Sequence, residues 1–207
     1  MARTLYNQKS MKNVSLALVF FFSAFTFSFG QQLDLPEWNA QSLDKQQKGM
    51  LVLASWAVGN IVWGSIAARN AGGSTRYFHQ MNAAWNTVNL GIAVLGYYQA
   101  QQTDPATWSL AESIRQNYKL EKILLLNTGL DLAYMAGGAW MIEKGKTAVE
   151  NQERWKGFGK SLILQGAFLL VFDIASFAIH AADNSQLENL TGKLQFGGNT
   201  AHLLLNF

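Results

Sequence analysis

Four long stretches of this chain are almost free of charged residues. The first, residues 49–68, holds no charged side chain, and similar stretches follow at residues 80–99, 123–142 and 160–180. A helix of about 20 residues is about 30 Å long, which matches the hydrocarbon core of a bilayer. A soluble helix of this length would carry charges along its outer face. The four stretches therefore predict four transmembrane helices.

The links between these stretches are short or polar. Residues 69–76 contain two glycines and two arginines, and residues 143–157 are rich in charged side chains. Short links make consecutive helices antiparallel neighbours. We therefore expect an all-α fold, an up-down-up-down four-helix transmembrane bundle over residues 31–185.

Local signals mark helix starts and a separate C-terminal tail. Pro36 and Pro105 precede apolar spans, as helix starts would have them, and Ser42 is a suitable N-cap for the first helix. Pro105, directly after an aspartate, predicts that the third helix begins there, and Ser109 with Glu112 fits a capping box either inside that helix or at a start of its own. In the tail, residues 186–207, the segments 191–196 and 200–207 flank two glycines and an asparagine. This pattern is typical of either a weak β-hairpin or an interfacial segment.

Residues 1–30 have the pattern of an export signal peptide. Small residues just before Gln31 favour cleavage at that point. The alternative is that the apolar run 14–30 stays attached as a fifth span, because its length is at the lower limit for crossing a bilayer. Export of residue 31 would place the links after the first and third spans in the cytoplasm. The basic residues of the signal precede the apolar run: Arg3, Lys9 and Lys12.

The net charge of +3 comes from the signal peptide alone, because 13 basic and 13 acidic residues cancel from residue 31 onward. A neutral mature chain gives no reason to expect nucleic acid as a partner. Lysines and arginines are equally numerous in the links on both predicted sides, so the positive-inside rule does not fix the orientation. The absence of cysteine excludes disulfides and thiolate chemistry.

Each predicted span has one face of polar or small residues. Residues three, four or seven apart share a face of a helix. Lipid cannot satisfy amides and carboxylates, so these faces should turn toward one another. The candidate buried polar layer consists of Asn60, Asn82, Asn86, Asn89, Asn127, Asp131, Gln165 and Asp173, and secondary candidates are His79, Tyr134 and His180.

Asp131 and Asp173 are the most reactive members of this layer. The third and fourth spans run in opposite directions, which places both residues about 12–13 Å from the outer ends of their helices. Two carboxyl groups within reach of each other do not both ionise at low cost, and no basic residue lies at that depth. We therefore expect at least one of them to be protonated at neutral pH, with the asparagines serving the pair.

Other chemistry has little support in the sequence. His79 and His180 fall at opposite ends of the predicted bundle, so they do not form a bis-histidine haem site. A zinc site needs three or four clustered ligands, and the histidines are scattered. No P-loop and no GxSxG motif is present. We predict no catalytic residue, no cofactor and no metal, and we expect the protein not to be an enzyme.

Three strings carry a family resemblance: FHQMNAAWNTVNLGIA (78–93), LLLNTGLDLAYMAGGAW (124–140) and LQGAFLLVFDIASF (164–177). They resemble a family of small four-helix membrane proteins of Bacteroidetes-type bacteria, whose function is unknown. The resemblance extends over residues 45–185. It implies a helical fold in the bacterial cytoplasmic (inner) membrane and assigns no role to any residue.

Two functions remain open at this point. The first is a non-enzymatic scaffold or accessory subunit, in which the buried amides hold the four helices together. The alternative is a small proton-coupled carrier or channel that uses Asp131 and Asp173, since acids inside a membrane mark proton and solute paths. In either case the expected partners are the lipid bilayer and either a second copy of the chain or another membrane protein.

Overall fold

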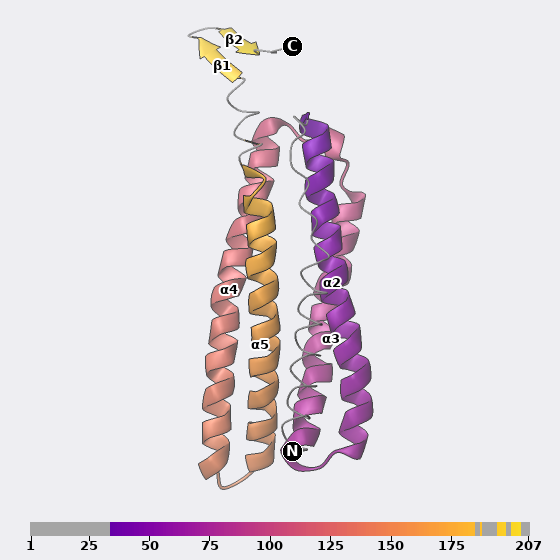
Figure 1. The fold of residues 1–207 in the computed structure, drawn as a ribbon, viewed down its shortest axis with the longest axis vertical. Coiled ribbons are helices and arrows are strands. Elements are labelled where there is room, and N and C mark those ends of the chain that lie inside the picture. The colour runs from indigo at the N-terminus through magenta and orange to yellow at the C-terminus, as the bar shows by residue number, and fades with distance from the viewer. Residues whose placement is uncertain (1–33, 185–186, 188–193, 198–199, 204–207) are drawn as a thin grey trace, which may run out of the picture. The chain divides into compact units, whose positions relative to one another are not determined.

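The structure is a computed structural model that describes residues 34–184, 187, 194–197 and 200–203. The prediction of an all-α body is confirmed, whereas the predicted signal peptide lies outside the described residues. Two short strands in the tail, β1 (Leu194–Gly197) and β2 (Thr200–Leu203), pair antiparallel. The helices in Figure 1 are α2 (Leu35–Asn70), α3 (Gly73–Gln102), the short 3-10 helix η1 (Pro105–Thr107), α4 (Leu110–Thr147) and α5 (Gln152–Ala181).

The first helix begins at the start that Pro36 indicates and not at Ser42. The carboxylate of Asp34 accepts a hydrogen bond of 2.9 Å from the backbone N–H of Glu37, and Pro36 lies in the first turn. Ser42 is instead buried inside α2, so its prediction as the N-cap is wrong. An aspartate cap followed by proline in the first turn is a strong start signal, and it acts before Ser42 is reached.

The third long helix begins at the later of the two predicted starts. Pro105 starts only η1, and α4 begins after Ser109, whose hydroxyl accepts a hydrogen bond of 3.3 Å from the N–H of Glu112. Trp108 between them has an extended backbone, which separates the two elements. A serine followed three residues later by glutamate is the capping-box pattern, and here it overrides the proline signal.

Consecutive helices pack as antiparallel pairs, α2 with α3 and α4 with α5. The two pairs meet along α3 and α5, which run parallel where Asn82 contacts Ser161. In contrast, α3 and α4 approach each other much less closely. The antiparallel register is marked by four contacts: Gly64 with Ala83, Met50 with Gly96, Gly138 with Gly159, and Gly145 with Lys156.

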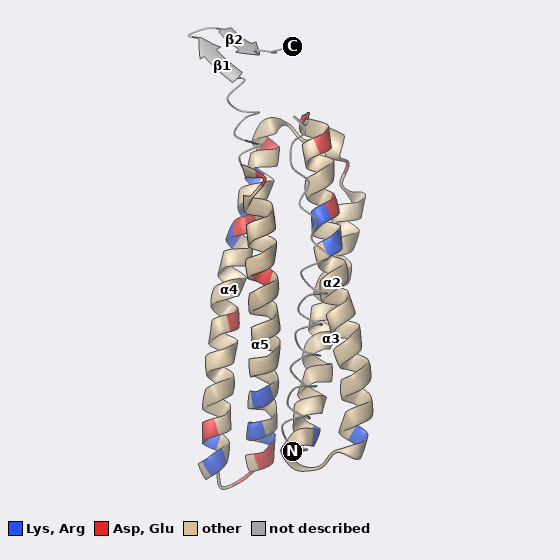
Figure 2. Ribbon diagram, viewed as in Figure 1, with Lys and Arg blue, Asp and Glu red and all other residues tan. Residues whose placement is uncertain are grey.

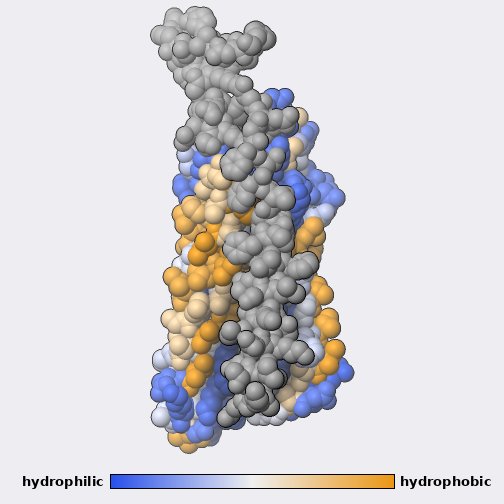
Figure 3. All heavy atoms as spheres, viewed as in Figure 1, coloured by the Kyte–Doolittle hydropathy of each residue, from blue (hydrophilic) through white to orange (hydrophobic). Residues whose placement is uncertain are grey.

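The four helices are apolar outside and polar inside. Trp63, Leu95 and Leu126 are 67%, 63% and 66% exposed, whereas Asn86 and Gln165 are 0% and 1% exposed. Figure 2 shows that most charged residues gather toward the ends of the helices, and Figure 3 shows apolar side chains over the middle. Water-soluble bundles have the reverse arrangement. In a bilayer, polar groups are found between helices.

Two of the helices, α2 and α5, are long and apolar enough to cross a membrane by length and composition alone. The sequence predicts spans in α3 and α4 as well, and these do not meet the same criterion. The polar residues of α3 and α4 lower their mean hydropathy, although Asn82, Asn86 and Asp131 are buried between helices. Two such helices are consistent with membrane association.

Candidate functional site

Gln165 of α5 connects three helices in the middle of the bundle. Its side-chain oxygen accepts a hydrogen bond of 2.9 Å from Trp56 Nε1, and its nitrogen donates to Oδ1 of Asn60 (3.4 Å) and of Asn82 (3.1 Å). The hydroxyl of Ser161 donates to the same Asn82 oxygen at 2.5 Å. Both donor positions of the Gln165 amide are therefore used, as stable buried networks require. We call these five residues the Gln165 network.

A line of asparagines extends this network along α3. Asn86 Nδ2 donates to the backbone oxygen of Asn82 at 2.8 Å, and Asn89 Nδ2 donates to Asn86 Oδ1 at 3.3 Å. All three side chains are buried. Asn82 and Asn89 are seven residues apart, which is about 10 Å along a helix. The line of asparagines therefore extends from the Gln165 network to a second group of polar residues.

Asp131 of α4 and Asp173 of α5 form the second group. They are 2% and 5% exposed and lie beside each other, with Asn127 next to Asp173. Two carboxyl groups this close do not both ionise at low cost. The Oδ2 atom of Asp131 is buried and has no hydrogen-bond partner among the described residues. The pair therefore keeps an unused acceptor.

A pocket of about 350 Å³ is lined by residues of all four helices, most of them from α3 and α4, and we call it the α3–α4 pocket. Its polar residues are Asn89, Asn127, Asp131 and Asp173, and the others that line it are apolar or aromatic. Exposed apolar side chains, including Ile92, stand at its mouth. Its volume is at the lower end of the range of small-molecule sites.

The predicted polar layer is divided into two groups. Asn60, Asn82 and Asn86 contact Gln165, Ser161 or one another. Asn127 lies with Asp131 and Asp173, and only Asn89 belongs to both settings. Asn60 and Asn82 therefore bond Gln165 directly, and Asn86 and Asn89 continue the line along α3, so the asparagines do not gather around the aspartates alone.

The secondary candidates have different positions. Tyr134 lines the α3–α4 pocket, and its ring meets the ring of Trp85 at 4.9 Å. The Nδ1 atoms of His79 and His180 are buried and have no hydrogen-bond partner among the described residues, and neither residue lines that pocket. In the part of the chain that the structure describes, no group of three His, Cys, Asp or Glu is placed to hold a metal ion.

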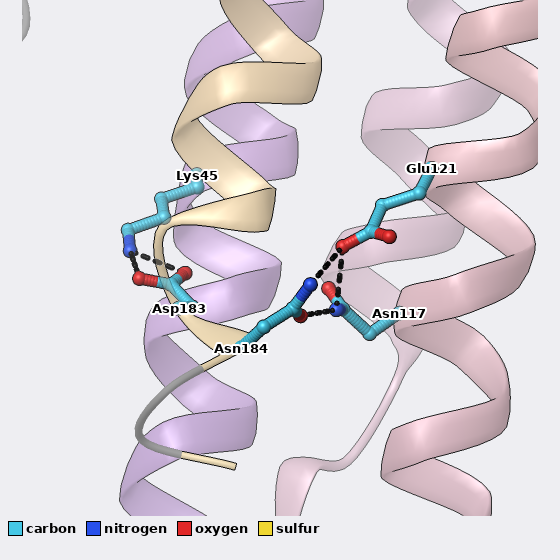
Figure 4. Close-up of polar contacts among 5 residues, drawn as sticks. All are labelled: Lys45, Asn117, Glu121, Asp183 and Asn184. Atoms are coloured by element: carbon cyan, nitrogen blue, oxygen red, sulfur yellow. Dashed lines mark hydrogen bonds and ion pairs between the residues drawn. The ribbon is translucent and has the colours of Figure 1, made fainter. Parts of the chain in front are cut away.

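Sequence reasoning misses a polar cluster where α5 ends (Figure 4). Lys45 of α2 pairs with Asp183 at 2.6 Å. Asn117 of α4 donates to Asn184 at 2.6 Å and to Glu121 at 3.0 Å, and Asn184 donates to the same Glu121 oxygen at 2.9 Å. Asn117 and Glu121 are four residues apart, and this spacing on a helix could have predicted that their side chains interact. The cluster joins the end of α5 to α2 and α4.

At the opposite end, where the links are short, Glu153 joins the two helix pairs. Its Oε2 atom accepts a hydrogen bond of 2.7 Å from the backbone N–H of Ser74. This hydrogen bond, with a smaller contribution from Lys156, holds the pKa of Glu153 below its ordinary value. The N-cap of α3 is Gly72, which has no side chain, so Glu153 takes the place of a capping residue.

The sequence pattern of one family matches residues 52–174, a range that contains the Gln165 network and the aspartate pair. The chain belongs to DUF6992, a family of unknown function. The predicted membership of an uncharacterised family is thereby confirmed. No curated protein and no solved structure matches this DUF6992 chain.

Proposed function

We propose that this DUF6992 protein is a multi-pass protein of the bacterial cytoplasmic membrane, inserted after an export signal. In this proposal α2, α3, α4 and α5 are the spans of an up-down-up-down bundle. The observation that carries it is the reversed distribution of polarity, in which Gln165 and Asn86 are buried while Leu126 and Trp63 are exposed. Water would destabilise that arrangement, and lipid would favour it.

Helix lengths support the same proposal. With 36 and 38 residues, α2 and α4 are about 54 and 57 Å long, well beyond the 30 Å hydrocarbon core. The excess lies mainly toward the end where α5 stops. Lys45 and Glu121 lie in these extra turns. We infer that this end stands in the interface or in water, where its charged residues are solvated.

The role that we propose is that of a non-enzymatic scaffold or accessory subunit. The Gln165 network supports it, because hydrogen bonds between Trp56, Asn60, Asn82 and Gln165 join α2, α3 and α5. A satisfied network of this kind gives a membrane bundle one well-defined packing. Its partner would be a second copy or another membrane protein.

Because the chain has no cysteine, its topology can be tested with single cysteines. We expect Ala106→Cys to react with a membrane-impermeant maleimide in intact cells, and Gly72→Cys and Val149→Cys to react only after permeabilisation. Leu126→Cys, in the middle of α4, should react in neither case. Labelling of Leu126→Cys at the rate of Val149→Cys would contradict the proposed membrane placement.

The scaffold role is tested by affinity purification from native membranes after crosslinking. A stable partner should co-purify with the wild-type chain and with an Asp131→Asn, Asp173→Asn double variant, because the partner surface lies on the outside of the bundle. Recovery of the chain alone, as a monomer, would contradict a scaffold role.

A second function, a proton-coupled carrier, is favoured by one observation. Asp131 and Asp173 both line the α3–α4 pocket. In a carrier, the double variant should insert normally and lose proton-linked flux in proteoliposomes. If wild-type vesicles show no such flux, the carrier function is wrong.

A further inference from the structure

We propose that the α3–α4 pocket is a binding site for a lipophilic amine, a molecule with a protonated amino group and an apolar body that reaches the site from the bilayer. The site goes beyond a scaffold role and rests on the proposed membrane placement. The pocket of about 350 Å³ opens between two helices that approach each other less closely than the helices of either antiparallel pair.

The polar residues of the pocket select for a cation. Asp131 lines the pocket and is 2% exposed, and its Oδ2 atom has no hydrogen-bond partner among the described residues. Asp173 lines the same pocket. Among the described residues, no lysine, arginine or histidine lines it, so no basic group there compensates a negative charge on the pair. A buried carboxylate that lacks a counter-charge is costly, and a bound ammonium group would supply both the charge and a hydrogen bond.

An aromatic wall adds to this selection. The rings of Trp85 and Tyr134 meet edge to face at 4.9 Å, and both residues line the pocket. Aromatic faces attract ammonium groups, most strongly where water is excluded. The Nε1–H of Trp85 is also buried without a hydrogen-bond partner in the described residues, so this wall holds a second polar atom whose hydrogen-bonding capacity is unused.

The mouth of the pocket explains the apolar body of the ligand. Val88 and Ile92 of α3 and Ile123 and Leu130 of α4 line the pocket and are 43% to 63% exposed. In a bilayer these side chains face lipid tails, and an alkyl chain can lie between them at no cost in exposed apolar surface. A bare metal ion would gain nothing from these apolar side chains, and the carboxylates of Asp131 and Asp173 would repel an anionic lipid.

The test measures binding of radiolabelled dodecylamine to the full chain in nanodiscs made of a neutral lipid. Its amino group is protonated at neutral pH, as that of a lysine is. We expect saturable binding that unlabelled dodecylamine displaces and that dodecanol and dodecanoate, which carry the same chain, do not displace. Non-saturable uptake equal to that of empty nanodiscs would overturn the proposal, as would equal displacement by dodecanol.

Variants assign the binding to the pocket. Asp131→Asn should weaken binding at least tenfold, whereas Asp44→Asn, which removes an exposed carboxylate paired only with Lys48, should leave it unchanged. Ile92→Trp fills the mouth without touching the aspartates and should also weaken binding at least tenfold. If both pocket variants bind as the wild type does, the site is not the α3–α4 pocket. The cysteine labelling described above reports membrane placement separately, so failure of one proposal is distinguishable from failure of the other.

Discussion

The seam between α4 and α5 and the seam between α3 and α4 are built in opposite ways. At the first, a Cβ atom added to Gly138 would lie 2.6 Å from the backbone oxygen of Gly159, so the two backbones are nearly in contact. At the second, large side chains such as Trp85 and Tyr134 hold the helices apart, and a pocket remains. Small residues let helices in a membrane approach closely.

The polar groups differ in the same way. Both amide hydrogens of Gln165 and its oxygen are hydrogen-bonded, and α2, α3 and α5 are fixed by it. Within the described residues, the Asp131 Oδ2 atom and the Trp85 Nε1 atom have no hydrogen-bond partner, and both residues line the pocket at the α3–α4 seam. We infer that the closed seams and the satisfied network stabilise the bundle, while the open seam is free to bind.

The largest expected effect comes from a substitution that separates α4 from α5 at their close contact. Gly138→Ala should lower the free energy of unfolding by about 2 kcal/mol, because its Cβ meets backbone that cannot turn away. Unfolding in detergent, followed by circular dichroism, measures the change. The matched control is Gly137→Ala, one residue earlier, where a Cβ meets nothing within 4 Å. That variant should gain about 0.5–1 kcal/mol from the lower entropy of the unfolded chain. Equal effects of the two would mean that α4 and α5 are not in close contact.

The next largest effect comes from a substitution that removes the hydrogen bonds of the Gln165 network. Gln165→Leu keeps a similar volume and leaves Trp56 Nε1 and the Asn82 side chain without one of their partners. We expect a loss of about 1–2 kcal/mol in the free energy of unfolding. Leu164→Gln is the reverse control, since Leu164 is exposed and its replacement removes no contact in the network. A neutral Gln165→Leu variant would show that the network is dispensable.

The sequence predicts which face of each helix is polar or small better than it predicts which residues that face contacts. Helical spacing identifies the faces of Asn82, Asn86 and Asp131, because a polar residue in an apolar span must turn inward. It does not predict that Asn82 would meet Gln165 and Ser161, since that depends on the axial shift between α3 and α5. The wide separation of α3 and α4 also cannot be predicted from the sequence, because it depends on how the two antiparallel pairs pack against each other.

A smaller effect concerns the aspartate pair itself. Asp131→Asn should change the free energy of unfolding by less than about 1 kcal/mol, because an amide of similar size replaces a carboxyl group whose Oδ2 atom makes no hydrogen bond among the described residues. Chemical unfolding at neutral pH provides the measurement. This near-neutral result, next to the larger loss in Gln165→Leu, would separate a binding group from a structural one. A loss as large as that of Gln165→Leu would instead place the pair among the stabilising contacts.

The smallest expected effect lies at the short links, where Glu153 ties α3 to α5. The hydrogen bond from Ser74 keeps the pKa of Glu153 below its ordinary value, so the folded protein binds a proton there less readily than the unfolded chain. The stabilisation is therefore present above the ordinary carboxyl pKa and is lost as the pH falls through the lowered one. Glu153→Gln should lower the thermal midpoint slightly at pH 7 and match the wild type in acid. Glu143→Gln, which removes an exposed carboxylate paired with Lys146, is the charge control. A pH-independent difference between Glu153→Gln and the wild type would show that Glu153 acts through packing rather than through its charge.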